Sequence, residues 1–82
     1  MINLAQRKEF YHGPLLPGTL AETTFYVKRF GQEIVCDVEV VEFRGASAAC
    51  ADSYLCHFIK PAGLEDRVIN SSDLYPFRYV ED

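Results

Sequence analysis

Residues 23–43, TTFYVKRFGQEIVCDVEVVEF, decide the fold of this chain. Between residues 33 and 43 every second side chain is apolar: Ile34, Cys36, Val38 and Val40. Asp37 and Glu39 fall between them and point to the opposite face. Strict alternation predicts a strand with one buried and one solvated face. Residues 23–30, rich in Thr, Phe, Tyr and Val, predict a preceding strand, and the Gly-Gln pair between the two predicts the turn of a hairpin.

Three more short strands are predicted downstream, at residues 53–60, 64–69 and 77–80. In the first of these both rows of side chains are largely apolar, which predicts a central strand covered on both faces. A Pro-Ala-Gly turn follows it. The polar residues 70–73 predict one turn of 3₁₀ helix before the last strand. The small residues of 44–52 predict a loop or a single helical turn.

The N-terminal part of the chain predicts no barrel strand. Residues 3–11 read as one or two helical turns, with Asn3 as N-cap and Gln6 three positions later. Residues 12–18 contain two prolines and two glycines, which predicts a loop.

The 82 residues are enough for one domain. We expect a mainly-β fold, a small five-stranded SH3-like barrel formed by residues 23–82, with residues 1–22 as an N-terminal arm and loop. Five short strands joined by tight turns, with no helix longer than about two turns, favour this architecture.

The charge pattern excludes one class of partner. The net charge is −4, made of +2 over residues 1–30 and −6 over residues 31–82. Direct binding of DNA or RNA needs a basic surface, and none is visible. An acidic surface keeps a domain soluble, meets a basic protein, or imitates nucleic acid.

The cysteines and apolar runs predict the compartment. Three cysteines, an odd number without a CxxC pair, favour a reducing environment. No apolar run approaches 18 residues, and no secretion signal is readable, so neither a transmembrane helix nor export is expected. We therefore expect a cytoplasmic protein that does not contact membranes.

No catalytic arrangement is readable. Cys56 and His57 are adjacent on a strand, so their side chains point to opposite faces and cannot form a nucleophile–base pair. The three cysteines and His57 lack zinc-ligand spacing. Asp37 and Glu39 share a solvated face. We therefore expect no catalytic residues, no metal, no cofactor and no enzymatic activity.

The segment Asp73–Val80, DLYPFRYV, resembles the closing motif of Src-homology-3 domains, a Leu–aromatic–Pro–x–x–Tyr–Val run that enters the last strand after a 3₁₀ turn. The resemblance covers eight of 82 residues, and the chain has no Trp. It implies that Leu74 and Val80 lie in the core. It also implies that Pro76 and Tyr79 help to line an aromatic groove for proline-rich peptides.

Two readings of the last strand compete with this motif. Alternation puts Phe77 and Tyr79 on one face of the strand and Val80 on the other. The motif places Val80 inside, whereas apolarity places Phe77 inside, so we expect Phe77 and Val80 both to be partly buried at a strand end and Tyr79 to be exposed. Tudor-like barrels are also similar to this chain in their strand order, and they bind methylated side chains in aromatic cages. Such a cage would come from Tyr26, Tyr54, Tyr75 or Tyr79.

The leading hypothesis is a non-catalytic protein-interaction module of a small accessory protein, of bacterial, phage or mobile-element origin. It would bind a protein partner, or itself as a homodimer, through an aromatic and acidic surface with five binding residues: Tyr26, Tyr54, Tyr75, Pro76 and Tyr79.

Two alternatives stay open. One is an oligomeric enzyme with a site between subunits. Plasmid-type dihydrofolate reductases are similar in length, but their pore-lining Val-Gln-Ile-Tyr motif is absent. The other is an acidic inhibitor of a nucleic-acid enzyme, which requires one continuous face of carboxylates: Asp37, Glu39, Glu42, Glu65 and Asp66.

Overall fold

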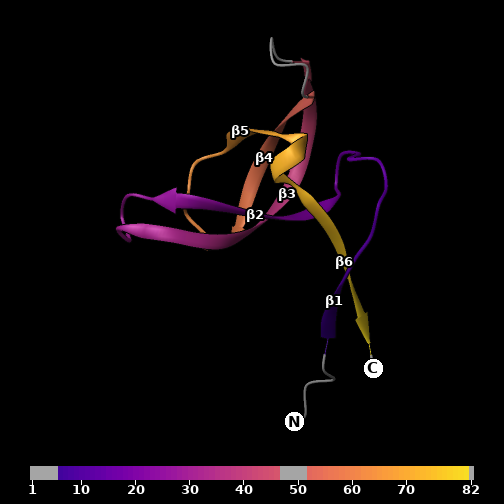
Figure 1. The fold of residues 1–82 in the computed structure, drawn as a ribbon, viewed down its shortest axis with the longest axis horizontal. Coiled ribbons are helices and arrows are strands. Elements are labelled where there is room, and N and C mark those ends of the chain that lie inside the picture. The colour runs from indigo at the N-terminus through magenta and orange to yellow at the C-terminus, as the bar shows by residue number, and fades with distance from the viewer. Residues whose placement is uncertain (1–5, 47–51, 82) are drawn as a thin grey trace.

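Six antiparallel strands and one short 3₁₀ helix make up the fold (Figure 1). A computed structural model of the chain describes residues 6–46 and 52–81. The elements are β1 (Gln6–Phe10), β2 (Leu20–Val27), β3 (Gln32–Ala46), β4 (Asp52–Lys60), β5 (Arg67–Asn70), η1 (Ser71–Asp73) and β6 (Tyr75–Glu81). The strands form one sheet in the order β1-β6-β2-β3-β4-β5. The predicted mainly-β class is confirmed.

The predicted hairpin is formed by β2 and β3. The two strands pair over their whole facing length, from Leu20 opposite Glu39 to Val27 opposite Gln32. In the turn, the N–H groups of Phe30 and Gly31 both donate hydrogen bonds to the Val27 carbonyl. Gly31 has a φ of 70°, in the left-handed region that favours glycine. Local sequence alone therefore indicated this hairpin, but its turn covers residues 28–31 rather than Gly31 and Gln32, and β2 begins at Leu20, inside the expected arm.

The core fills the inner face of the curled sheet. Its buried side chains come from β2, β3, β4, β5 and the residue after η1: Ala21, Val27, Cys36, Val38, Val40, Cys56, Phe58, Ile69 and Leu74. The alternation of β3 and the core position of Leu74 are thus confirmed. At the edge of this core the half-buried Phe25 ring packs edge-on against Phe58, with 5.2 Å between ring centroids.

The sheet is open, so the expected closed barrel is wrong. β6 begins opposite Glu22 and pairs with β2 only through Leu20–Glu22, while its other edge pairs with β1. On that side no described strand pairs with residues 23–27 of β2. β5 pairs only with β4 among the described strands. Residues of β2 and β5 jointly line a hollow of about 230 Å³ where a barrel would have closed.

The expected N-terminal helix is also wrong within the described residues, because residues 6–10 form β1. Phe10 lies directly opposite Phe77 in the β1–β6 ladder, and their rings are 5.9 Å apart. Short isolated helices are marginal in water, so a long-range strand pairing outweighs a local capping pattern. Asn3, the expected N-cap, lies outside the described residues.

Other expectations are corrected in detail. β4 is not covered on both faces, because His57 and Ile59 are exposed while Cys56 and Phe58 are buried. Residues 44–46 continue β3 rather than forming a loop, and 47–51 lie outside the described residues. Val80 is half-buried and Tyr79 exposed, as expected, whereas Phe77 is fully rather than partly buried.

β1 and the C-terminal half of β6 form a two-stranded ribbon that extends away from the rest of the sheet (Figure 1). We call it the terminal ribbon. The described residues contain a single helix, η1, of three residues, and no helix that could cross a lipid bilayer.

The two faces of β3 can be tested with one substitution at two positions. Val38 is 0% exposed and Val35 is 58% exposed, on opposite faces of the same strand. We expect Val38→Asp to lower the free energy of unfolding by about 3–5 kcal/mol, because the new carboxylate is buried without a partner. Val35→Asp should change it by less than about 1 kcal/mol. Denaturant titration measures both, and a normally stable Val38→Asp protein would reverse the face assignment.

Candidate functional site

The strand register gathers aromatic and charged side chains on the outer face, opposite the core. Tyr75 lies opposite Glu22, and Glu22 lies opposite Asp37. Along the terminal ribbon, Phe10 faces Phe77, and the next pair on that face is Lys8 and Tyr79. These side chains share one face because directly opposed residues of antiparallel strands point the same way.

Phe77 is the centre of a small aromatic cluster outside the main core. Its ring lies 5.3 Å from the Tyr79 ring and 5.9 Å from the Phe10 ring, centroid to centroid. The Lys8 ammonium lies 4.6 Å from the Phe77 ring centroid. The terminal ribbon therefore buries Phe77 on a face that the rest of the sheet leaves open.

Asp37 is only 6% exposed, so the expected solvated position is wrong. Lys8 Nζ donates to Asp37 Oδ1 at 2.6 Å and to Glu22 Oε2 at 2.7 Å. A buried carboxylate needs such a partner, because an unpaired charge away from water is strongly destabilising. The sequence showed the alternation of β3, but it gave no sign of the lysine that covers this face.

Lys8 remains an ammonium. Desolvation by burial lowers its pKa, but hydrogen bonds to Asp37 and Glu22, and the negative charges of both, outweigh desolvation and raise the pKa above the usual value of 10.5. One positive charge thus faces two carboxylates. We call Lys8, Glu22 and Asp37 the charged cluster.

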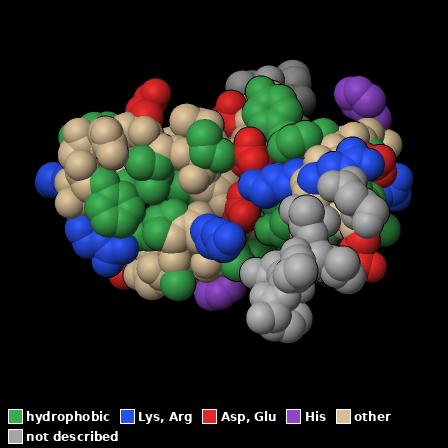
Figure 2. All heavy atoms as spheres, turned by 90° about the horizontal axis from the view of Figure 1, so that it is seen from below, with side chains coloured by type: hydrophobic (Ala, Val, Ile, Leu, Met, Phe, Trp, Pro, Cys, Tyr) green, Lys and Arg blue, Asp and Glu red, His purple; other side chains and the backbone are tan. Residues whose placement is uncertain are grey.

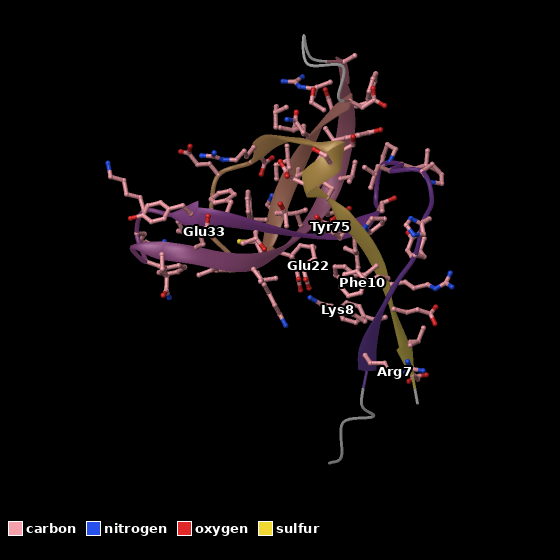
Figure 3. The ribbon with its side chains drawn as sticks, in the orientation of Figure 1. Arg7, Lys8, Phe10, Glu22, Glu33 and Tyr75 are labelled. Carbon is pink, nitrogen blue, oxygen red and sulfur yellow. The ribbon has the colours of Figure 1, made fainter. Side chains whose placement is uncertain are left out.

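A groove lies where the end of β1, η1 and the start of β6 meet. Its volume is about 570 Å³, and it is lined by Phe10, Tyr11, His12, Glu22, Ser71, Ser72, Leu74, Tyr75 and Pro76. We call it the aromatic groove. Phe10 is 51% and Tyr75 is 59% exposed. Figure 3 shows Lys8, Glu22, Phe10 and Tyr75 gathered in one region, with Glu33 far away at the β2–β3 hairpin.

The structure separates the five predicted binding residues. Tyr75 and Pro76 line the aromatic groove, and Tyr79 lines an adjoining hollow of about 450 Å³. Tyr11 lines both, so these three predicted residues belong to one continuous surface. An aromatic cage formed by all four predicted tyrosines is therefore not present, because the remaining two lie elsewhere.

Tyr26 lies on β2, where it lines a separate hollow with Lys28, Arg29 and Arg67. Tyr54 is half-buried on β4 and packs against Phe43, with 5.4 Å between ring centroids. Seen from below (Figure 2), hydrophobic side chains gather at the end that holds the β2–β3 hairpin, with basic side chains beside them, and acidic and basic side chains also meet near the middle.

Of the nine residues that line the groove, sequence reasoning proposed two, Tyr75 and Pro76, as binding residues. Phe10, Tyr11 and His12 were assigned to a helix and a loop, although an adjacent Phe-Tyr pair favours strands. Glu22 was placed in the N-terminal arm. Its role depends on the pairing of β2 with β6, which no local pattern shows.

Neither described cysteine is poised for catalysis. Burial raises the pKa of the Cys56 thiol to about 11, and the charge of Asp66 adds to the effect. Burial, and then the charge of Asp37, also raises the pKa of the Cys36 thiol. Both thiols therefore remain protonated at neutral pH. Cys50 lies outside the described residues.

The charges elsewhere do not form a bare acidic face. Glu42 pairs with Arg44 at 2.9 Å, and Asp66 Oδ1 lies 2.7 Å from His57 Nδ1. With Asp37 held by Lys8, three of the five carboxylates proposed for nucleic-acid mimicry have a cationic or imidazole neighbour. Within residues 6–46 and 52–81, no group of three His, Cys, Asp or Glu side chains could hold a metal ion.

Comparison of this chain with protein-family models, with curated protein sequences and with solved structures finds no match.

The charged cluster can be tested against another ion pair of the terminal ribbon. We expect Lys8→Met to lower the free energy of unfolding by about 1–3 kcal/mol, because Asp37 loses its partner. Arg78→Met breaks an exposed pair with Glu9, so it should cost about 0.5 kcal/mol or less. Chemical denaturation measures both. Equal effects would show that Lys8 does not hold the ribbon.

The same cluster gives a pH test. Because folding raises the Lys8 pKa, its contribution is complete below the unfolded value of 10.5 and is lost as pH rises through the folded value. As pH rises through the folded pKa of Lys8, the free energy of unfolding of Lys8→Met should therefore fall less than that of the wild type.

The thiols can be tested in a Cys50→Ser protein, which keeps Cys36 and Cys56. At pH 8 we expect an aromatic disulfide reagent to modify them about 100-fold more slowly in the folded protein than in denaturant, because burial and raised pKa values suppress the thiolate. Rapid modification of two thiols in the folded protein would contradict the buried positions.

Proposed function

We propose that this chain is a non-catalytic protein-interaction module, and that the aromatic groove holds a segment of a partner polypeptide. The observation that carries the proposal is the position of Phe10 and Tyr75. Both rings are more than half exposed beside one hollow of about 570 Å³, a size typical of binding pockets.

Strand pairing fixes the backbone positions of both residues. Phe10 is paired with Phe77 and its ring also contacts the Phe77 ring, and Tyr75 is paired with Glu22. Exposed aromatic side chains are enriched in protein interfaces, where they bury a large area at low cost in conformational entropy. A backbone that is ordered before binding loses less entropy on binding, which supports a recognition role.

An enzymatic role has less support. The two described cysteines are protonated and Lys8 is held as an ammonium, so none of these three is an activated nucleophile. The inhibitor alternative is not supported either, because its carboxylates are largely paired. A second copy of the chain is the other possible occupant of the groove, as in a two-fold dimer. The cytoplasmic location and the bacterial, phage or mobile-element origin stay predictions from the sequence.

Photo-crosslinking tests the proposal, with p-benzoylphenylalanine placed at Tyr75 or at Tyr26 in the native host. Tyr26 is a matched control, because it is 57% exposed, against 59% for Tyr75, and lies outside the groove. We expect a discrete protein adduct at Tyr75 that is absent at Tyr26. An adduct of twice the chain mass would identify a second copy. The same adducts at both positions, or none at Tyr75, would refute the proposal.

A further inference from the structure

The aromatic groove has an uncompensated negative charge in its wall. Lys8 supplies one positive charge to both Glu22 and Asp37. Asp37 is almost fully buried, whereas Glu22 also reaches the groove. The three side chains of the charged cluster therefore carry a net charge of about −1, and Lys60, which lies opposite Asp37 in the β3–β4 ladder, does not line the groove. A partly buried charge is screened less by water than an exposed one, so it acts strongly on a ligand in contact.

The other lining residues do not neutralise this charge. Glu22 is the one Asp, Glu, Lys or Arg side chain among the described residues that line the groove. The nearest basic side chains of the terminal ribbon are engaged with other groups. Lys8 is held inside the charged cluster, and Arg78 pairs with Glu9 at 2.8 Å and lies over the Tyr11 ring.

The groove combines this carboxylate with aromatic walls. The faces of aromatic rings carry negative potential and attract cations within about 6 Å. This chain already uses that interaction beside the groove, where the Lys8 ammonium lies 4.6 Å from the Phe77 centroid and also contacts Glu22. The Arg78 guanidinium lies 5.3 Å from the Tyr11 centroid. A ring next to a carboxylate is thus a setting that holds a cation in this structure.

We propose that the aromatic groove recognises a cationic side chain, an arginine or a lysine, in a basic segment of the partner polypeptide. The cation would contact the Glu22 carboxylate, and its aliphatic stem would pack against Phe10 and Tyr75. Arginine fits best, because its planar guanidinium both stacks on rings and forms two parallel hydrogen bonds to a carboxylate. This inference rests on the proposed function and narrows its partner to basic polypeptides.

The test is an NMR titration of the full chain with N-acetyl-argininamide, and separately with N-acetyl-citrullinamide, a neutral analogue of nearly the same shape. We expect saturable shifts at Phe10, Tyr11 and Tyr75, with an affinity on the order of millimolar and at least about 5-fold tighter for the arginine compound.

Two variants and one control locate the interaction. Glu22→Gln should reduce the preference for arginine over citrulline to below about 2-fold. Tyr75→Ala leaves the charged cluster intact and should weaken binding of the arginine compound about 5-fold or more. Tyr26→Ala should leave the titration unchanged. Loss of the arginine preference at higher salt would further support a charge interaction.

Each failure has a distinct meaning. Equal shifts from both compounds, or no shifts in the groove, would overturn the inference of cation selectivity. A partner crosslinked at Tyr75 through a segment without arginine or lysine would overturn it as well. The proposed function itself fails only if crosslinking does not distinguish Tyr75 from Tyr26.

Discussion

The ammonium of Lys8 joins the terminal ribbon to the rest of the sheet. Its hydrogen bonds reach Glu22 on β2 and Asp37 on β3, so a single side chain connects three strands. The backbone link is slight, because β6 pairs with β2 only through Leu20–Glu22. Without Lys8, Asp37 would be a buried charge with no partner, and the ribbon would lose its main side-chain attachment. The β1–β6 ladder sets how the aromatic side chains of the ribbon lie relative to one another, and Lys8 connects that ladder to β2 and β3.

β6 joins the terminal ribbon to the rest of the sheet. It lies between β1 and β2, and it pairs with β2 along one edge through residues 75–77 and with β1 along the other edge through residues 77–81. Because β6 begins opposite Glu22, it does not reach residues 23–27 of β2, and among the described strands the sheet stays open there. The pairing with β1 brings Phe10 beside Phe77 on the outer face, where Phe77 is buried.

The charged cluster also links stability to the proposed recognition. In the charged cluster two carboxylates share one ammonium, so one negative charge stays unbalanced. This arrangement does not stabilise the fold as much as a balanced set of charges would. That charge is located at the wall of the aromatic groove through Glu22. A cation supplied by a partner would complete the cluster, and binding would then also reinforce the attachment of the terminal ribbon.

The sequence by itself determined the β2–β3 hairpin, the inward face of β3 and the short helix η1. Each follows from residues close together in the chain, through a period of two or a short run of turn residues. The tertiary structure alone decided that residues 6–10 form a strand, that Asp37 is buried, and that the sheet does not close into a barrel. These features depend on contacts between distant residues, such as Lys8 with Asp37, 29 positions apart, and Glu9 with Arg78, 69 positions apart. Local preference does not encode such pairings, because their free energy exists only once the strands lie side by side.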